Sequence, residues 1–318
     1  MSYPFKGIIP PLITPLHSDF SLDVESLEKV IAHVIEGGVH GVFILGTTGE
    51  FAGLSQKTKA TLIRESSRIV KGRVPILVGI SDCSIEESLI LAKEAKDAQA
   101  SGLVATTPFY MNIGQEELIQ YYEILADSVE LPLLLYNMPG NTQMHIAPST
   151  AAALAKHPKI IGIKDSSGNL TTFQSFLHAL REFPDFVVLV GPEEILADTL
   201  AMGGDGGVTG GANLFPQLYV GLYEAFQKGE MEKVAALQEA IGFLSDQLYQ
   251  NDTYSSSYLK GLKAAMSFAG LCKGNLALPL YGYSEVEKKS LLEKYDMVKK
   301  RIEGLGIGIR KQRFENGD

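Results

Sequence analysis

The strongest constraint on the fold of this chain is a repeated alternation of short apolar runs with longer amphipathic runs. Eight of the short runs are predicted to be strands, and most are almost continuously apolar, which is typical of strands buried on both faces. These predicted strands are residues 7–15, 39–46, 75–81, 102–108, 132–138, 160–166, 186–192 and 206–213. The last run is rich in glycine and carries the weakest strand pattern.

The segments that follow these strands carry apolar residues at helical spacing. These predicted helices are residues 23–36, 56–70, 85–98, 115–128, 148–156, 170–182, 193–202 and 215–228. A strand followed by a helix, repeated eight times, predicts parallel strands joined by crossover helices. Eight such units that close on themselves form a (β/α)8 TIM barrel, which is the fold that we expect for this α/β chain.

An open, doubly wound sheet is the alternative arrangement for such an alternation. That fold normally has a Gly-x-Gly-x-x-Gly turn after its first strand. Here the first predicted strand ends in Ile-Thr-Pro-Leu at residues 13–16, and the motif occurs nowhere in the chain. The sequence therefore favours the closed barrel.

Past residue 228 the pattern is helical only, with predicted helices at 230–250, 255–268 and 285–305. We therefore expect a barrel domain over residues 1–228 and a C-terminal helical bundle over residues 229–318. A stripe on the last helix is expected to face the core, with a partner-binding surface as the alternative. The stripe consists of Val286, Leu292, Tyr295, Val298 and Ile302. The charged tail at residues 310–318 is expected to fray.

Charge and cysteine content argue against several classes of protein. The chain has 28 Lys and Arg against 37 Asp and Glu, a net charge of −9, which disfavours binding to nucleic acid or to an anionic membrane. Cys83 and Cys272 are too few for a disulfide framework or a structural zinc site, and the six histidines are scattered. The first residues show no signal peptide, and no apolar run has the ~18 residues of a membrane span. We expect a cytoplasmic protein without a metal site.

Lys164 is the most informative single residue. In a barrel of this kind, chemistry occurs where the strands end and the following loops begin. Lys164 stands there, directly after the apolar residues 160–163. A buried lysine loses its proton more readily, and a neutral amine is a nucleophile toward a carbonyl carbon. The alternative is a structural lysine that extends to the rim or pairs with Asp165.

Tyr136 ends the preceding predicted strand, after three leucines. Adjacent parallel strands lie about 4.8 Å apart. The phenol of Tyr136 is therefore expected to reach a carbonyl group bound to Lys164 and to exchange protons with its oxygen. The alternative is a tyrosine with its ring in the core and its hydroxyl in water.

Two further strand ends carry polar groups. Residues 46–49, Gly-Thr-Thr-Gly, allow close backbone approach and are suited to bind a carboxylate through hydroxyl and N–H groups, with a plain turn as the alternative. Glu193 and Glu194 follow the seventh strand, where they either oppose a helix dipole or bind substrate hydroxyls.

Residues 203–207 resemble glycine loops that bind phosphate, so a phosphate-binding barrel enzyme of unrelated chemistry is a competing hypothesis.

Three motifs are more specific together than any of them alone. They are Gly-Thr-Thr-Gly-Glu at 46–50, Tyr-Asn-x-Pro at 136–139 and Gly-Ile-Lys-Asp-Ser at 162–166. With these motifs the chain resembles the dihydrodipicolinate synthase / N-acetylneuraminate lyase family of class I aldolases that act on pyruvate. The resemblance extends from residue 7 to at least residue 227, and the helical extension also fits. It implies a TIM-barrel enzyme that needs no cofactor, because the substrate is held as an imine on a lysine.

The resemblance implies a role for each matching residue. Lys164 would form the Schiff base with pyruvate, and Tyr136 would act as general acid and base over the imine. Thr47 and Thr48 would form the carboxylate loop, with Thr47 also in the proton relay. Tyr110 would enter the site of a neighbouring subunit and complete that relay, which implies a homodimer or homotetramer.

Departures from the family pattern bear on the second substrate, an aldehyde. Dihydrodipicolinate synthases have an arginine for the aldehyde's carboxylate where this chain has Asn141, and an amide cannot form a bidentate charged pair. Glu193 and Glu194 lie where sialic acid lyases have acids that bind sugar hydroxyls, although those lyases usually have serine in place of Thr47. Val208 would form an apolar wall on the bound pyruvate.

These departures predict an aldolase for a 2-keto-3-deoxy sugar acid. The alternatives within the family are dihydrodipicolinate synthase, N-acetylneuraminate lyase and a sugar-acid dehydratase. A non-enzymatic sugar-acid sensor on this fold is a further alternative. Such a sensor would lack the pair formed by Lys164 and Tyr136, and both residues are present.

Overall fold

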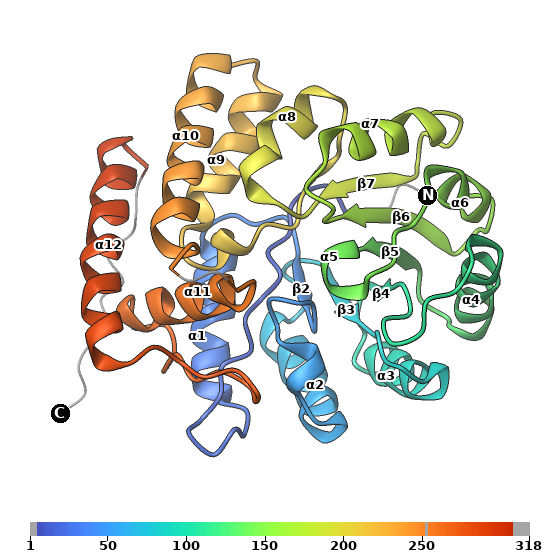
Figure 1. Cartoon of the computed structure of the whole chain (residues 1–318), viewed down its shortest axis with the longest axis horizontal. Coiled ribbons are helices and arrows are strands. Elements are labelled where there is room, and N and C mark those ends of the chain that lie inside the picture. Colours follow the sequence, from blue (N-terminus) through green and yellow to red (C-terminus); the bar gives the residue numbers. More distant parts are fainter. Residues whose placement is uncertain (1–4, 252–253, 308–318) are drawn as a thin grey trace.

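The computed structural model describes residues 5–251 and 254–307, and eight parallel strands form its centre (Figure 1). The strands are β1 (Gly7–Ile8), β2 (Val42–Ile44), β3 (Ile76–Gly79), β4 (Gly102–Thr106), β5 (Leu133–Asn137), β6 (Ile160–Asp165), β7 (Val187–Val190) and β8 (Gly206–Gly207). They are hydrogen-bonded in the order β1-β8-β7-β6-β5-β4-β3-β2. Three backbone bonds close the remaining gap: His40 N–H donates to Ile8 O at 2.8 Å, Leu12 N–H donates to Phe43 O at 2.7 Å, and Phe43 N–H donates to Pro10 O at 3.0 Å. The prediction of a TIM barrel is confirmed.

Helices cover the outside of the barrel. They are α1 (Val24–Glu36), α2 (Gln56–Val70), α3 (Ile85–Asp97), α4 (Gln115–Ser128), α6 (Pro148–Leu154), α7 (Leu170–Ala179), α8 (Leu196–Ala201) and α9 (Pro216–Gln227). The side chains of Asp23, Ser55 and Asn169 begin α1, α2 and α7, because each accepts the N–H of the residue three positions on. Short turns occupy four of the loops after the strands: η1 (Phe51–Gly53), α5 (Pro139–Thr142), η2 (Glu193–Ile195) and η3 (Gly210–Asn213).

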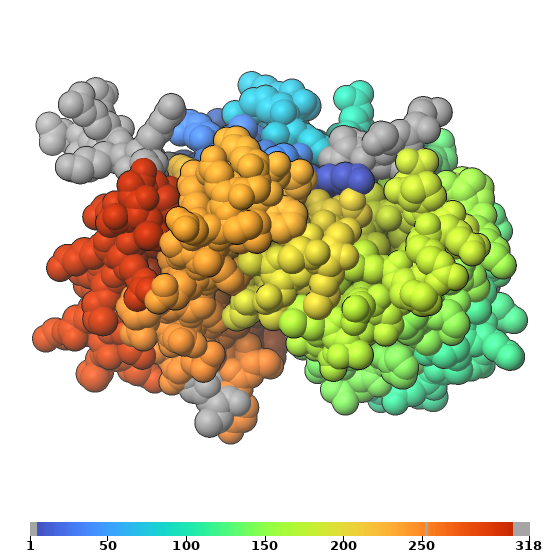
Figure 2. Space-filling view, turned by 90° about the horizontal axis from the view of Figure 1, so that it is seen from above, coloured from blue at the N-terminus to red at the C-terminus, as the bar shows by residue number. Residues whose placement is uncertain are grey.

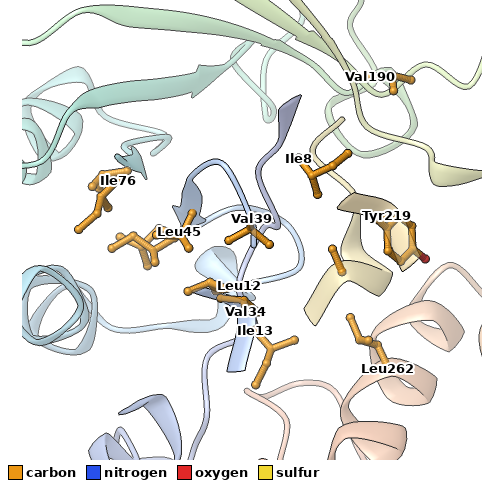
Figure 3. Close-up of a cluster of buried hydrophobic side chains, with 14 of the residues drawn as sticks. Ile8, Leu12, Ile13, Val34, Val39, Leu45, Ile76, Val190, Tyr219 and Leu262 are labelled. Carbon is orange, nitrogen blue, oxygen red and sulfur yellow. The ribbon is translucent and has the colours of Figure 1, made fainter. Parts of the chain in front are cut away.

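Three C-terminal helices extend the barrel on one side: α10 (Met231–Leu248), α11 (Ser256–Phe268) and α12 (Glu285–Gly304). Figure 1 shows α12 at the outer edge, and the space-filling view in Figure 2 shows these orange and red helices directly beside the yellow and green half of the barrel. Leu262 of α11 belongs to the same buried cluster as Ile8 and Tyr219 of the barrel (Figure 3). The division at residue 228 stays a prediction, since the two parts share this core.

Two apolar layers fix the strand orientations. Side chains alternate along a strand, so one set points into the barrel and the next set points toward the helices. The inner cluster contains Tyr136 and Val208 together with Phe43, Leu134 and Leu189. Tyr136 therefore enters the inside of the barrel from the end of β5, above its apolar filling.

Asn213 joins the last strand–helix unit to the first. Its side-chain oxygen accepts the N–H of Ile13 at 3.1 Å, and its side-chain nitrogen donates to Pro11 O and Gly210 O, each at 2.8 Å. The side chain is fully buried. One amide thus satisfies three backbone groups at the seam between the segment after β8 and the segment after β1.

The predicted end of the eighth strand and the predicted burial of two residues on the last helix are wrong. The eighth strand is predicted to extend to residue 213, but it ends at Gly207 and Gly210–Asn213 forms η3. On α12, Val286 is 82% exposed and Leu292 is 40% exposed, whereas Leu291 is buried. Val286 lies in the first turn of α12, and of two adjacent leucines only Leu291 falls on the buried face with residues 295, 298 and 302. The tail at 310–318 lies outside the described residues.

Candidate active site

A cavity of about 670 Å³ lies between the carboxyl ends of the barrel strands and the C-terminal helices. All predicted site residues except Tyr110 line it: Thr47, Thr48, Tyr136, Asn141, Lys164, Glu193, Glu194 and Val208. The opposite wall comes from α10, α11 and the segment between them, including Ser245, Tyr249 and Tyr258. A concave, partly apolar site at this end of a TIM barrel is where catalysis is expected.

Lys164 and Tyr136 face each other across two hydrogen-bonded strands. They occupy paired positions of β6 and β5. The Nζ atom of Lys164 lies 3.8 Å from the centre of the Tyr136 ring and 5.6 Å from the centre of the Phe43 ring. Lys164 is 5% exposed and Tyr136 is 3% exposed. This amine lies over two aromatic rings and is nearly excluded from water, so its environment differs from that of a surface lysine.

The phenol of Tyr136 is tuned by its neighbours. Its hydroxyl lies 3.2 Å from the hydroxyl of Thr47, within hydrogen-bond distance. Burial raises the pKa of this phenol, but the charge of Lys164 and hydrogen bonds to Thr47 and Ser166 more than offset burial, so the pKa lies below its usual value. A phenol whose pKa is shifted toward neutral pH gives up its proton more readily, which suits a group that donates a proton and later takes one back.

Asp165 does not take the role of counter-ion to Lys164. Because consecutive strand residues point to opposite faces, its carboxylate is turned away from the barrel interior. It accepts the side-chain N–H of Asn137 at 2.7 Å and the N–H and hydroxyl of Ser167 at 3.1 and 2.9 Å. Burial raises its pKa despite these bonds. The pair formed by Asn137 and Asp165 instead ties the ends of β5 and β6 together just beyond Tyr136 and Lys164.

The predicted carboxylate loop follows β2 as expected. Its backbone is held from below by Thr14, whose hydroxyl donates to Gly49 O at 2.7 Å. The hydroxyl of Thr48 lies 3.0 Å from the hydroxyl of Tyr258 on α11. Tyr258 is a site residue that sequence reasoning missed, since it lies 210 positions along the chain from Thr48 and only a general helical pattern marks its segment.

Glu193 has partners inside the protein. Its two carboxylate oxygens accept the Tyr219 hydroxyl at 2.5 Å and the Gly211 N–H at 2.7 Å. The oxygens come this close because residue 211 is glycine: a Cβ there would lie 1.9 Å from the Tyr219 hydroxyl. Glu194 accepts the hydroxyl of Ser245 from α10 at 2.5 Å. Both acids thus lie in the cavity wall, with Glu193 the more enclosed.

Burial and the charge of Glu194 raise the pKa of Glu193 to about 7, against the opposing effect of its hydrogen bonds. A folded-state pKa above the ordinary 4.5 means that the fold favours the neutral acid. The stability that this group contributes is complete below about pH 4.5 and is lost as the pH rises through about 7. We expect Glu193→Gln to gain up to about 3 kcal/mol of unfolding free energy relative to the wild type between these two pH values.

Urea denaturation at a series of pH values measures this difference. Glu285→Gln is the control, since the side chain of Glu285 is 89% exposed at the start of α12. Parallel stability curves for the wild type and Glu193→Gln across this pH range would contradict the assignment of a raised pKa to Glu193.

The remaining predicted residues divide into two groups. Asn141 lies on the short turn α5 at the cavity mouth, and Val208 is 3% exposed on the cavity floor after β8. Tyr110, in contrast, is 87% exposed in the loop between β4 and α4 and does not line the cavity of its own chain. Its predicted entry into a neighbouring subunit stays a prediction.

The described part of the chain contains no cluster of three or more His, Cys, Asp and Glu side chains suited to a metal ion. Within the same residues, 5–251 and 254–307, no helix has both the length and the apolar character needed to cross a bilayer.

Fold and cavity together define a class of enzyme: a TIM-barrel lyase of the class I aldolase type, with a buried lysine beside a tyrosine on the next strand. A model of the dihydrodipicolinate synthetase family matches residues 4–299. The chain belongs to that family, and it is an enzyme of that family's aldolase class.

Three relatives illustrate the range of the family. The solved structure of dihydrodipicolinate synthase from Bacteroides thetaiotaomicron is 47% identical, with a TM-score of 0.90 over 93% of this chain and 100% of that chain. The probable 2-dehydro-3-deoxy-D-pentonate aldolase YjhH of Escherichia coli K12 is 36% identical over 86% of this chain and 91% of that protein. YagE of E. coli K12, solved in complex with pyruvate, is 31% identical, with a TM-score of 0.86 over 95% of this chain and 99% of that chain.

Proposed function

We propose that this enzyme joins pyruvate to a polyhydroxylated aldehyde, or cleaves the resulting 2-keto-3-deoxy sugar acid, through an imine on Lys164. The observation that carries the proposal is the contact between the buried Lys164 Nζ atom and the Tyr136 ring, 3.8 Å away inside the cavity. The pyruvate complex of YagE supports pyruvate as the first substrate.

The reaction begins when the Nζ atom of Lys164 attacks the carbonyl carbon of pyruvate. Loss of water leaves a C=N bond in place of C=O. Tyr136 then takes a proton from the methyl group, and the resulting enamine carbon forms the new C–C bond with the carbonyl carbon of the aldehyde, whose oxygen becomes a hydroxyl group. Tyr136 supplies and accepts the protons at the oxygens involved, and Thr47, 3.2 Å from its hydroxyl, continues the relay. Water finally hydrolyses the imine and frees Lys164.

Pyruvate is bound at the end of the cavity next to Lys164. Thr47 and Thr48 bind the carboxylate through the loop after β2, and Val208 packs against the methyl side. Tyr110 completes the proton relay from a neighbouring chain, so the active form is a homodimer or homotetramer. The enzyme acts in the cytoplasm and uses no cofactor other than the imine.

The charge of the far end argues for a hydroxylated acceptor. Among the described residues that line the cavity, Lys164 is the one cationic side chain, while Glu193 and Glu194 are acidic. Asn141 provides an amide at the mouth. A second carboxylate, as in aspartate semialdehyde, meets like charge here without a cationic partner, at a cost of several kcal/mol. The hydroxyl groups of a sugar-like aldehyde can instead donate hydrogen bonds to the two glutamates and accept one from the amide of Asn141. Dihydrodipicolinate synthase is the alternative function.

We expect a ratio of kcat/KM above one for glyceraldehyde-like acceptors over aspartate semialdehyde. Asn141→Arg should lower this ratio by about 10- to 100-fold, because it adds a charged hydrogen-bond donor for the carboxylate. Steady-state kinetics with both aldehydes measures it. Gln143→Arg is the matched control: it adds the same charge two residues away, on an exposed side chain outside the cavity lining. Faster condensation of the wild type with aspartate semialdehyde than with every polyhydroxy aldehyde tested would favour the alternative.

A further inference from the structure

The carboxylate loop, residues 46–50, is attached at two points to a helix outside the barrel. Near its middle, the hydroxyl of Thr48 lies 3.0 Å from that of Tyr258 on α11. At its end, Glu50 forms an ion pair with Lys263, also on α11, with 2.5 Å between Oε1 and Nζ. The loop therefore receives contacts from a single helix of the C-terminal extension at both positions.

The barrel leaves space for the side chain of Tyr258 to enter the cavity. Residue 210, after β8, is glycine, and a Cβ there would lie 1.6 Å from the Tyr258 hydroxyl. The ring is further fixed edge-on against Tyr249, with ring centres 4.8 Å apart. Burial and the charge of Glu193 raise the pKa of Tyr258, so it stays a neutral phenol that can donate or accept a hydrogen bond. Tyr258 and Thr48 both line the cavity.

The second attachment is a fully buried ion pair. The side chains of Glu50 and Lys263 are each 1% exposed. The other oxygen of Glu50 accepts the N–H of Ala277 at 2.7 Å, and Lys263 also donates to Asn275 O at 2.5 Å. A buried pair with these added bonds is a specific connection rather than a general source of stability. Glu50 also has a left-handed backbone with φ of 58°, so the loop leaves β2 in a defined direction.

We propose that α11 is a positioning element of the active site: Tyr258 orients the Thr48 hydroxyl toward the substrate carboxylate, and Lys263 fixes the end of the same loop through Glu50. This inference rests on the proposed function, in which that loop binds pyruvate. Tyr258 and Lys263 are positioning residues, since they act through Thr48 and Glu50. The C-terminal helices thereby set pyruvate affinity, while the lysine and tyrosine of the barrel carry out the chemistry.

The test compares the full-length wild type with Tyr258→Phe. Calorimetry should show pyruvate binding weakened by about 3- to 10-fold, the effect of one hydrogen bond, with the KM for pyruvate raised to match. The kcat at saturating pyruvate should stay within about twofold, because Thr47, Tyr136 and Lys164 are untouched. Tyr295→Phe is the matched control: it removes the hydroxyl of a buried tyrosine of α12 that does not line the cavity.

Gly210→Ala should reproduce the loss of pyruvate affinity while residue 258 is still tyrosine. The added methyl group pushes the Tyr258 hydroxyl away from Thr48. Lys263→Met leaves Glu50 as an unpaired buried charge and is expected to unfold readily. The double variant Glu50→Gln with Lys263→Met removes both charges, and it should fold and still bind pyruvate more weakly.

Unchanged pyruvate affinity in Tyr258→Phe and in the double variant would overturn the inference, as would an equal loss in Tyr295→Phe. Borohydride trapping with pyruvate separates this result from the function itself. A wild type that binds pyruvate but is not trapped refutes the imine, while the calorimetric comparison still decides the role of α11.

Discussion

Lys164→Ala is expected to lower kcat by roughly 10⁴-fold or more, the scale at which enzymes lose activity with their covalent nucleophile. Without the Nζ atom no imine forms, and the tyrosine and threonines have no intermediate to act on. The fold should survive, because the substitution removes a costly buried amine and leaves no unpaired carboxylate: Asp165 bonds to Asn137 and Ser167. Borohydride reduction with pyruvate, followed by peptide mapping, should place one adduct per wild-type chain on Lys164 and none on the variant.

Lys159→Ala is the matched control for that experiment. Lys159 immediately precedes β6, the strand that contains Lys164. Its Nζ atom donates to Ala126 O at 3.0 Å and to Val129 O at 2.7 Å. This variant should be trapped as fully as the wild type. An adduct on any lysine other than Lys164 would refute the assignment of the nucleophile.

Tyr136→Phe is expected to lower kcat by roughly 10²- to 10⁴-fold, the usual contribution of a positioned acid–base group. The ring stays, so its contact with Lys164 and its packing in the barrel are kept, and only the hydroxyl that bonds to Thr47 is lost. Steady-state kinetics measures the loss, and circular dichroism melting shows that the fold is intact.

Tyr295→Phe serves as control for this substitution. Tyr295 is a buried tyrosine of α12 whose ring stacks on Phe215, remote from the cavity lining. Its kcat should stay within about twofold of the wild type. If Tyr136→Phe had a kcat equally close to the wild type, Tyr136 would return to a purely structural role.

The barrel could be predicted because its signal is local and repeated. Each buried strand is an apolar run bounded by turn residues, and Lys164 and Tyr136 stand out as polar groups at the ends of two such runs. Their adjacency follows from the order of parallel strands alone. Eight of the nine predicted site residues line one cavity, although Asn141 and Val208 among them were implied by the family resemblance and not by strand order.

Features that depend on tertiary contacts could not be predicted. Glu193 lies at the expected strand end, yet its oxygens bond to Tyr219 and to Gly211, a choice made by packing of α9 and η3. Tyr258 is one of several tyrosines on amphipathic segments, and the room for its hydroxyl depends on the glycine at position 210, far away in the sequence. On α12 the helical period permits either of two adjacent leucines on the buried face.

The seam held by Asn213 has a consequence for how the chain folds. Its bonds to Pro11 and Ile13 join residues 202 and 200 positions apart, so they form only after the intervening strands are in place. Until β8 is in place, the edge of β1 that pairs with β8 is unpaired, and such an edge is a template for association with other chains. Long-range closure of this kind slows folding. The pairing of β1 with β8 and the Asn213 amide beside it therefore also end the period in which this edge is exposed to aggregation.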